Sequence, residues 1–306
     1  MSLPAGYTSR SMLLEDAPLI AERSAAYTSA LLGFPKHSPE DVANYLRDPA
    51  INLTTDGWLV LDPNDQFAGS ATAVTTPTHV NVDILSENPA ILDWLLNQAE
   101  TRAGGEVVVR VGVIRHDTLL PEVLRARGYA VGTSVQRMRI GFDGAVEAPV
   151  TPAGVVVRRG AVDEASKRAA HGVLMEGFKE QPGALPRPFD EWVASRESRS
   201  TFDWSQVTIV ELDGQPVGMT ECNDNFVSTD NCGYVGRLAV VPAARGRGLA
   251  KFLLRTAFAT DAAAGRDGTI LHVDSSNPTP AVALYTGVGM RPDLISDIWQ
   301  RTTRPA

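Results

Sequence analysis

Residues 235–250 read VGRLAVVPAARGRGLA, an apolar segment, then a loop that alternates arginine and glycine, then the start of an amphipathic helix. The first amides of a helix have no intrahelical partner and lie at the positive end of its dipole, so they bind anions. Gly246 and Gly248 allow close approach of a phosphate and backbone angles that a side chain forbids. Residues 241–260 carry basic side chains and no acidic one, although the whole chain has a net charge of −8. The pattern predicts a strand, a diphosphate-binding loop and a helix.

Other glycine-rich turns between a strand and a helix fit this stretch less well. A dinucleotide-binding turn has three glycines at fixed spacing and an acid about 20 residues further on. A nucleoside-triphosphate loop ends in Gly-Lys-Ser/Thr, which is absent here. A solvated basic helix start after a proline turn accounts for the arginines but not for the glycines beside them.

The stretch resembles the acyl-CoA-binding motif of the GNAT superfamily of N-acetyltransferases. The family pattern is Arg/Gln-x-x-Gly-x-Gly/Ala, which Arg245, Gly248 and Ala250 match. Residues 270–290 are similar to the family's next motif, which is a strand, an asparagine, a short helix with a Leu-Tyr pair and a Gly-aromatic end. The two motifs occur in the family's order along the chain.

The second motif departs from the family pattern at two points. Ala281 follows Asn277 by one position more than is usual, and Met290 replaces the aromatic residue. The resemblance implies acetyl-CoA as cosubstrate, with the strand offering backbone groups to the pantetheine arm and the loop amides holding the diphosphate. The cofactor-binding residues that it implies are Leu238, Ala239, Val240, Arg245, Gly246, Arg247, Gly248, Leu249, Ala250 and Asn277.

The resemblance also implies the reaction. An acceptor amine must be neutral to attack the acetyl thioester, and the departing thiolate needs a proton. Tyr285 occupies the family's general-acid position, and a buried tyrosine that only packs its ring is the alternative. Residues 232–241 hold no carboxylate, where many relatives have a glutamate. The candidates for the base are therefore Glu221, Asp224 and Asp274.

Composition limits the class of protein. The 306 residues are 43% hydrophobic and 21% charged, as in an ordinary globular protein of about two domains. The acidic balance disfavours a nucleic-acid partner, and there is neither a membrane-spanning apolar run nor a basic-then-apolar leader. Cys222 and Cys232 are too few for a disulfide framework or a metal site, although they would face each other across a hairpin with its tip near residues 227–228. We expect a cytoplasmic enzyme without a metal.

The chain repeats itself loosely. Residues 58–69 and 207–218 each read as a β-hairpin, and residues 145–154 are rich in proline and small side chains. We therefore expect a first domain over residues 1–144, a linker over 145–154, and a second domain over residues 155–306.

Only the second domain contains the phosphate loop. In the first domain, residues 79–100 carry four acidic side chains and no lysine or arginine, so the corresponding helix start would repel a diphosphate. The architecture resembles actinobacterial tandem GNAT acetyltransferases, among them the mycothiol synthases. There the degenerate domain either helps to wall the acceptor pocket or is purely structural.

The predicted fold class is α/β: two tandem GNAT folds, each a mixed sheet with helices on both faces, the first one degenerate. The predicted function is direct transfer of an acetyl group from acetyl-CoA to the amine of a small molecule. A cysteinyl pseudodisaccharide acceptor and a non-catalytic acyl-CoA-binding module are the alternatives. The strands expected in the second domain are residues 155–159, 206–212, 216–224, 232–241, 269–274 and a strand pair ending near 302, and the helices are 161–179, 188–198, 246–263 and 280–287.

Overall fold

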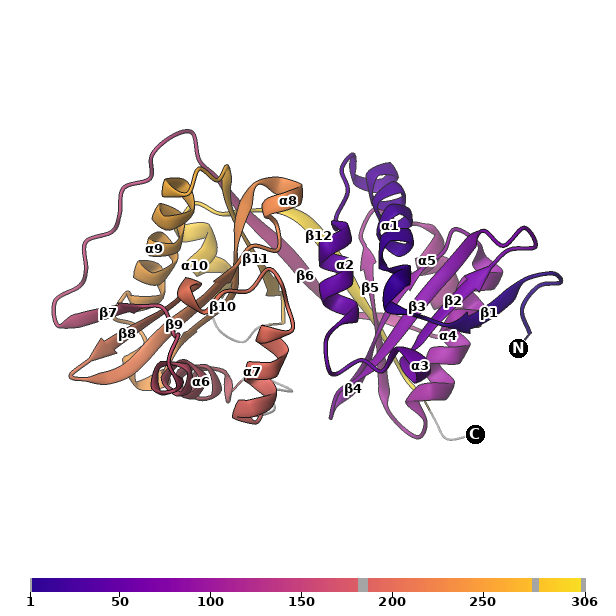
Figure 1. The fold of residues 1–306 in the computed structure, drawn as a ribbon, viewed down its shortest axis with the longest axis horizontal. Coiled ribbons are helices and arrows are strands. Elements are labelled where there is room, and N and C mark those ends of the chain that lie inside the picture. The colour runs from indigo at the N-terminus through magenta and orange to yellow at the C-terminus, as the bar shows by residue number, and fades with distance from the viewer. Residues whose placement is uncertain (1, 181–186, 277–280, 304–306) are drawn as a thin grey trace. The chain divides into compact units, whose positions relative to one another are not determined.

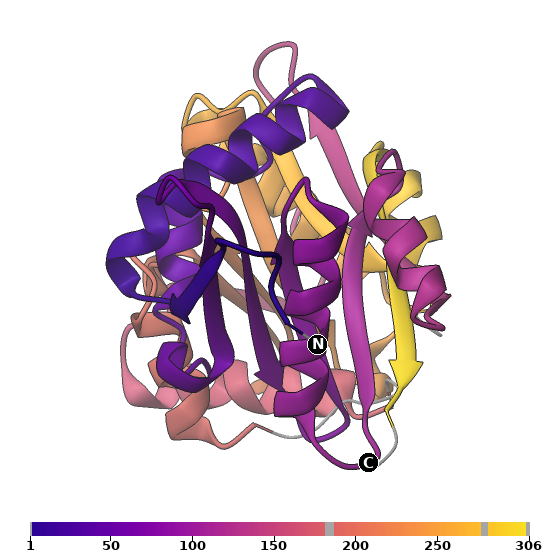
Figure 2. The same cartoon turned by 90° about the vertical axis from the view of Figure 1, so that its right-hand side faces the viewer.

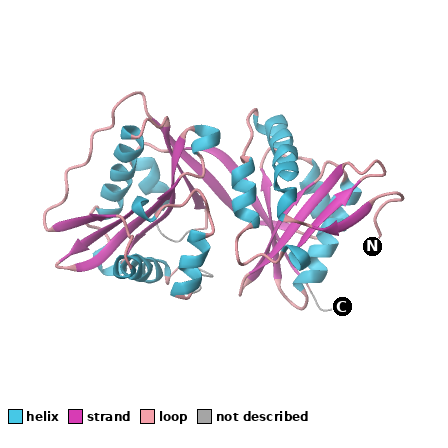
Figure 3. Cartoon of the chain, viewed as in Figure 1, coloured by secondary structure: helices cyan, strands magenta, loops and turns pink. Residues whose placement is uncertain are grey.

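The computed structural model describes residues 2–180, 187–276 and 281–303. Its internal contacts define two compact units, Met1–Val135 with Ile295–Ala306, and Gln136–Leu294. Each unit combines a sheet with helices (Figures 1 and 3).

The division differs from the expected boundary at residue 144, because it falls inside two strands, β6 (Ala130–Gly141) and β12 (Arg291–Thr302). The stretch expected to be a linker, residues 145–154, lies in the second unit and leads from β6 to β7 (Val155–Arg159).

In the first unit, the strands of the sheet follow the order β1-β2-β3-β4-β5-β12. Only β4 and β5 pair in parallel, and the pairs from β1 to β4 are antiparallel. In Figure 2, α4 lies in front of these strands and covers one face of the sheet. The elements are β1 (Thr8–Ser11), α1 (Ala17–Leu32), α2 (Pro39–Leu46), α3 (Leu53–Asp56), β2 (Gly57–Leu61), β3 (Phe67–Thr75), β4 (His79–Leu85), α4 (Pro89–Ala103), β5 (Val108–Ile114) and α5 (Leu119–Ala126).

In the second unit, the strands follow the order β6-β11-β10-β9-β8-β7, and α6 and α9 lie on opposite faces of the sheet (Figure 1). Its elements agree with the predicted ranges to within a few residues, except that one strand, β12, replaces the expected final pair. The elements are α6 (Glu164–Phe178), α7 (Phe189–Glu197), β8 (Val207–Leu212), β9 (Gln215–Asn223), α8 (Val227–Asp230), β10 (Cys232–Val240), α9 (Leu249–Ala263), β11 (Gly268–Asp274) and α10 (Ala281–Gly287).

The expected repeat is present in the topology. In the second unit, β7 to β10 pair antiparallel in sequence order, and β10 pairs in parallel with β11. The first unit has the same pattern, with β1 to β4 antiparallel and β4 parallel to β5. The helices that link the parallel strands, α4 and α9, have equal lengths of 15 residues. The tandem mixed-sheet fold predicted from the sequence is therefore confirmed.

The last strands are assigned differently from the prediction. Residues 296–302 of β12 pair antiparallel with β5 in an uninterrupted register, from Ser296 opposite Ile114 to Thr302 opposite Val108. Trp299 is 7% exposed and belongs to the apolar core of the first unit. The end of the chain, expected in the second domain, thus completes the sheet of the first unit.

Residues 136–141 of β6 in turn belong to the second unit. Met138 is fully buried there among side chains of α9, β10 and β11. The second unit therefore includes part of β6, which precedes it in the sequence, and the first unit includes most of β12, near the C-terminus.

The expected hairpin tip near residues 227–228 is a short helix, α8, and the two cysteines do not face each other. Cys222 pairs with Val235 on β10, whereas Cys232 pairs with Gly268 on β11, and both thiols are free. Within the described ranges, every helix is too short or too polar to cross a membrane.

Candidate functional site

Two neighbouring parallel strands of the second unit separate and form a V. In the described part of the chain, β10 and β11 pair only through residues 232–234 and 268–270. Just beyond that point a β-bulge at Gly236 shifts the register of β10 on β9, so that Val235 faces Cys222 and Arg237 faces Glu221. Bulges bend and twist a strand, and this one turns β10 away from β11.

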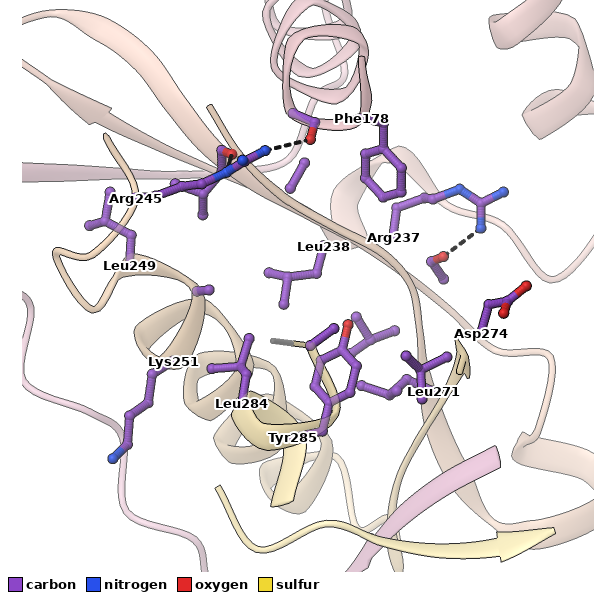
Figure 4. Close-up of a pocket in the computed structure, with 18 of the residues that line it drawn as sticks. Phe178, Arg237, Leu238, Arg245, Leu249, Lys251, Leu271, Asp274, Leu284 and Tyr285 are labelled. Atoms are coloured by element: carbon purple, nitrogen blue, oxygen red, sulfur yellow. Dashed lines mark hydrogen bonds between the residues drawn. The ribbon is translucent and has the colours of Figure 1, made fainter. Parts of the chain in front are cut away.

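A cavity of about 830 Å³ lies in this V, between α6, α9 and α10. Its volume lies within the range of roughly 300–1,000 Å³ typical of small-molecule sites. In Figure 4, Arg245, Leu249 and Lys251 lie towards one side of the view, Arg237 and Asp274 towards the other, and Leu238 and Tyr285 between them. The cavity brings together these residues predicted from the sequence: Leu238, Ala239, Val240, Arg245, Gly246, Gly248, Leu249, Ala250, Asp274 and Tyr285.

The glycine loop ends at a helix N-terminus that no side chain caps. Gly246 and Gly248 both have φ +78°, a left-handed conformation that other L-residues rarely adopt, which explains glycine at both positions. Gly248 is the N-cap of α9, with no side-chain hydrogen bond at the cap and no acidic residue in the first turn. The first residues of α9 line the cavity, and amides at this position of a helix have no intrahelical partner and can bind an anion.

The side chain of Arg245 is engaged by the protein. Its guanidinium donates to the Gly177 carbonyl at 2.9 Å, to a Glu180 carboxylate oxygen at 2.7 Å and to the Val240 carbonyl at 3.4 Å. These bonds fasten the loop to the end of α6 and to the end of β10. The structure thus gives Arg245 a positioning role, whereas the exposed Arg247 does not line the cavity that the described residues form.

Tyr285 projects from α10 into the cavity (Figure 4). Burial raises the pKa of its hydroxyl to about 12, with a smaller contribution from Tyr234. The phenol therefore keeps its proton at neutral pH, as a general acid must. Asn277 lies outside the described residues.

The three candidate bases occupy different places. Asp274 lines the cavity, and its Oδ1 accepts from the Ser276 amide and hydroxyl. Glu221 and Asp224 are not among the described lining residues. Glu221 is buried in an ion pair with Arg196 at 3.1 Å, and Asp224 pairs with Arg266 at 2.8 Å.

Several residues that line the cavity were not among the predicted site residues. Arg237 and His272 are polar and exposed, and His272 shares a hydrogen bond of 3.1 Å with the Tyr234 hydroxyl. Alternation along β11 places His272 on the same face as Ile270 and Asp274, but a histidine at a sheet edge fits that pattern equally well, and no sequence signal marks the bulge that sets Arg237. The other missed lining residues include Phe178, Lys251, Leu271 and Leu284. No group of three or more metal-ligating side chains occurs in the described chain.

Residues 174–290 match the family model described as Acetyltransferase (GNAT) family. The chain is 29% identical over 297 residues to a mycothiol acetyltransferase of Jonesia denitrificans, covering 92% of this chain and 90% of the relative.

Two solved structures share the fold over nearly the whole chain. A GCN5-related N-acetyltransferase from Sphaerobacter thermophilus superposes with a TM-score of 0.82 at 24% identity, covering 100% of this chain and 98% of the other. A tandem GNAT protein from the clavulanic acid biosynthesis pathway gives a TM-score of 0.77 at 15% identity, covering 98% and 99%.

Proposed function

We propose that this protein transfers an acetyl group from acetyl-CoA to the amine of a small molecule, and the match of residues 174–290 to the GNAT acetyltransferase family model supports this. One observation carries the proposal: an uncapped helix N-terminus, preceded by two left-handed glycines, opens onto a cavity that also holds a protonated phenol. An anionic donor and a leaving group that needs a proton suit these two features.

In the proposed complex, the first amides of α9 hold the diphosphate of CoA. The pantetheine arm lies along residues 238–240, where β10 has separated from β11 and its backbone can donate and accept. The side chain of Arg245 keeps the loop in place. The thioester then reaches the region of Tyr285, which lies between the two ends of the cavity (Figure 4).

The reaction is a direct transfer. The acceptor nitrogen bonds to the acetyl carbon and the bond from carbon to sulfur breaks. We assign the proton from the nitrogen to Asp274, directly or through water, because this is the candidate carboxylate that lines the cavity. The CoA thiolate takes the proton of Tyr285. Since acetyl-CoA is made and used inside cells, the proposal also places the protein in the cytoplasm.

A second candidate acceptor comes from the similar protein of Jonesia denitrificans, whose name is mycothiol acetyltransferase. By analogy, the acceptor of this chain would be the amine of a cysteinyl pseudodisaccharide. The cysteinyl group is also a small-molecule amine, so one assay covers both candidate acceptors.

The test combines binding with turnover. Calorimetric titration with acetyl-CoA measures the donor site, and release of free CoA thiol measures transfer to a panel of amines that includes a cysteinyl pseudodisaccharide. We expect acetyl-CoA binding and amine-dependent CoA release. Binding without release on any acceptor would favour a non-catalytic acyl-CoA-binding module, and the absence of binding would refute the donor site itself.

A further inference from the structure

Resting on the proposed function, we infer that the acceptor amine carries an anionic group, a carboxylate or a phosphate, and that Arg237 binds it. Arg237 lines the cavity on β10, one residue before the segment proposed for the pantetheine arm. Its side chain is exposed.

The bulge at Gly236 decides where Arg237 points. Because the bulge skips one residue, Arg237 takes the position opposite Glu221. Ala239, two residues on, packs with α6 and α7, whereas Leu238 packs with Phe252 of α9. By alternation Arg237 faces the α6–α7 side of the sheet, and α9 with its diphosphate-binding amides lies on the other side. The guanidinium therefore lies on the face of the sheet opposite α9, and we place the acceptor on this face.

The carboxylate opposite Arg237 is already engaged. Both Nε and Nη2 of Arg196 lie 3.1 Å from Oε2 of Glu221, and these two side chains are 8% and 6% exposed. Burial, together with the positive charge of Arg237, lowers the pKa of Arg196. The Glu221 carboxylate is thus paired with Arg196, although Arg237 lies opposite Glu221 in the strand register.

Arg237 itself makes one hydrogen bond in the described part of the chain, from Nη1 to the Gly236 carbonyl at 2.7 Å. In Figure 4 its guanidinium extends away from the end of the cavity that holds Arg245 and Lys251. An arginine presents up to five donors in a planar fork that matches carboxylate and phosphate oxygens. An anion on the acceptor would meet this fork while its amine lies near the thioester.

The test compares matched pairs of amines that differ in charge. L-Alanine is paired with L-alaninamide, and O-phosphoethanolamine with ethanolamine, so the two pairs distinguish a carboxylate from a phosphate. We expect the wild type to prefer the anionic member of at least one pair in kcat/KM. Arg237→Gln should lower kcat/KM for that member about 10- to 100-fold, as for a lost hydrogen bond to a charged group, and should spare the neutral member. Arg237→Lys should retain part of the preference because it keeps the charge but not the fork.

A matched control removes a positive charge elsewhere in the second unit. Arg168 is 57% exposed on α6 and pairs with Glu164 one turn away, so Arg168→Gln should leave the preference and the melting temperature nearly unchanged. Acetyl-CoA affinity is measured for every variant, and we expect Arg237→Gln to retain it.

The outcomes separate this inference from the proposed function. Equal use of both members of each pair, or weaker acetyl-CoA binding in Arg237→Gln without a change in acceptor preference, overturns the inference while acetyl transfer stands. If acetyl-CoA binds but nothing is acetylated, calorimetry measures how tightly each of the four amines binds to the complex with CoA. Equal affinity for the anionic and neutral amines then overturns the inference. Failure of the wild type to bind acetyl-CoA refutes the proposed function.

Discussion

Asp261 makes the stability of the second unit depend on pH. It lies on the buried face of α9, and its carboxylate packs against Gly233, where a Cβ would come within 2.1 Å of Oδ2. This is the paired end of β10 and β11, from which the V opens. Burial raises the pKa of Asp261 to about 6, although the Thr269 hydroxyl donates a hydrogen bond to it and Arg266 lies 4.0 Å away.

The direction and size of the effect follow from the two pKa values. The unfolded chain releases this proton near the ordinary aspartate pKa of 3.8, and the folded chain releases it near pH 6. Between these values the folded state binds more protons, so the free energy of unfolding falls as the pH rises from about 4 to about 6 and stays lower above. The difference between these two pKa values corresponds to about 3 kcal/mol.

Asp261→Asn removes the charge and keeps an oxygen that can accept from Thr269. We expect the variant to be more stable than the wild type by up to about 3 kcal/mol at pH 7.5, as a rough upper figure, and by little at pH 4. Denaturant unfolding from pH 4 to pH 8 measures this difference. The exposed hairpin residue Asp213 supplies the control, because Asp213→Asn should show no such dependence. A constant difference between Asp261→Asn and the wild type across this pH range would refute the reasoning.

Three further predictions concern the donor site and the exchanged strand. Tyr285→Phe should lower kcat about 100-fold or more and leave acetyl-CoA affinity unchanged in calorimetry, because only the proton donor is lost. Gly248→Ala should weaken acetyl-CoA binding at least about tenfold. The control is Gly214→Ala, at a hairpin glycine of similar φ (+72°) with equally open surroundings. Both variants should lose about 1–2 kcal/mol of stability, but Gly214→Ala should not affect binding. Trp299→Ala should destabilise the first unit by about 3–5 kcal/mol in denaturant unfolding, because it removes a buried ring that also stacks with Arg125 at 5.2 Å.

Local signals in the sequence were sufficient for most elements and for the donor loop. The hairpins at residues 58–69 and 207–218 and the glycine pair before α9 are set by alternation and by backbone angles that nearby residues determine. The assignment of β12 could not be predicted in this way, because an alternating strand fits the edge of either sheet. Its partner, β5, lies far away in the sequence, and the pairing brings Trp299 into the apolar core of the first unit.

The site shows the same limit at the level of single residues. The motif indicates an arginine at position 245 but not its partners. The structure shows that this guanidinium, at the edge of the cavity, donates to carbonyl groups of α6 and β10. Uninterrupted alternation would place Arg237 on the same face as Val235. The bulge reverses this, and a bulge depends on pairing with β9 that sequence periodicity does not report.

The two units show why a shared fold does not imply a shared ligand. At the start of α4, Pro89 has no amide hydrogen, the Ala90 amide donates to the Asn88 side chain at 3.0 Å, and the Ile91 amide donates to the Asn88 carbonyl. No first-turn donor remains there for a phosphate. At the start of α9, Gly248 supplies no side chain, so the corresponding amides stay available. The asparagine cap and the proline that follows it, together with the acidic residues around α4, therefore restrict the proposed CoA site to the second unit.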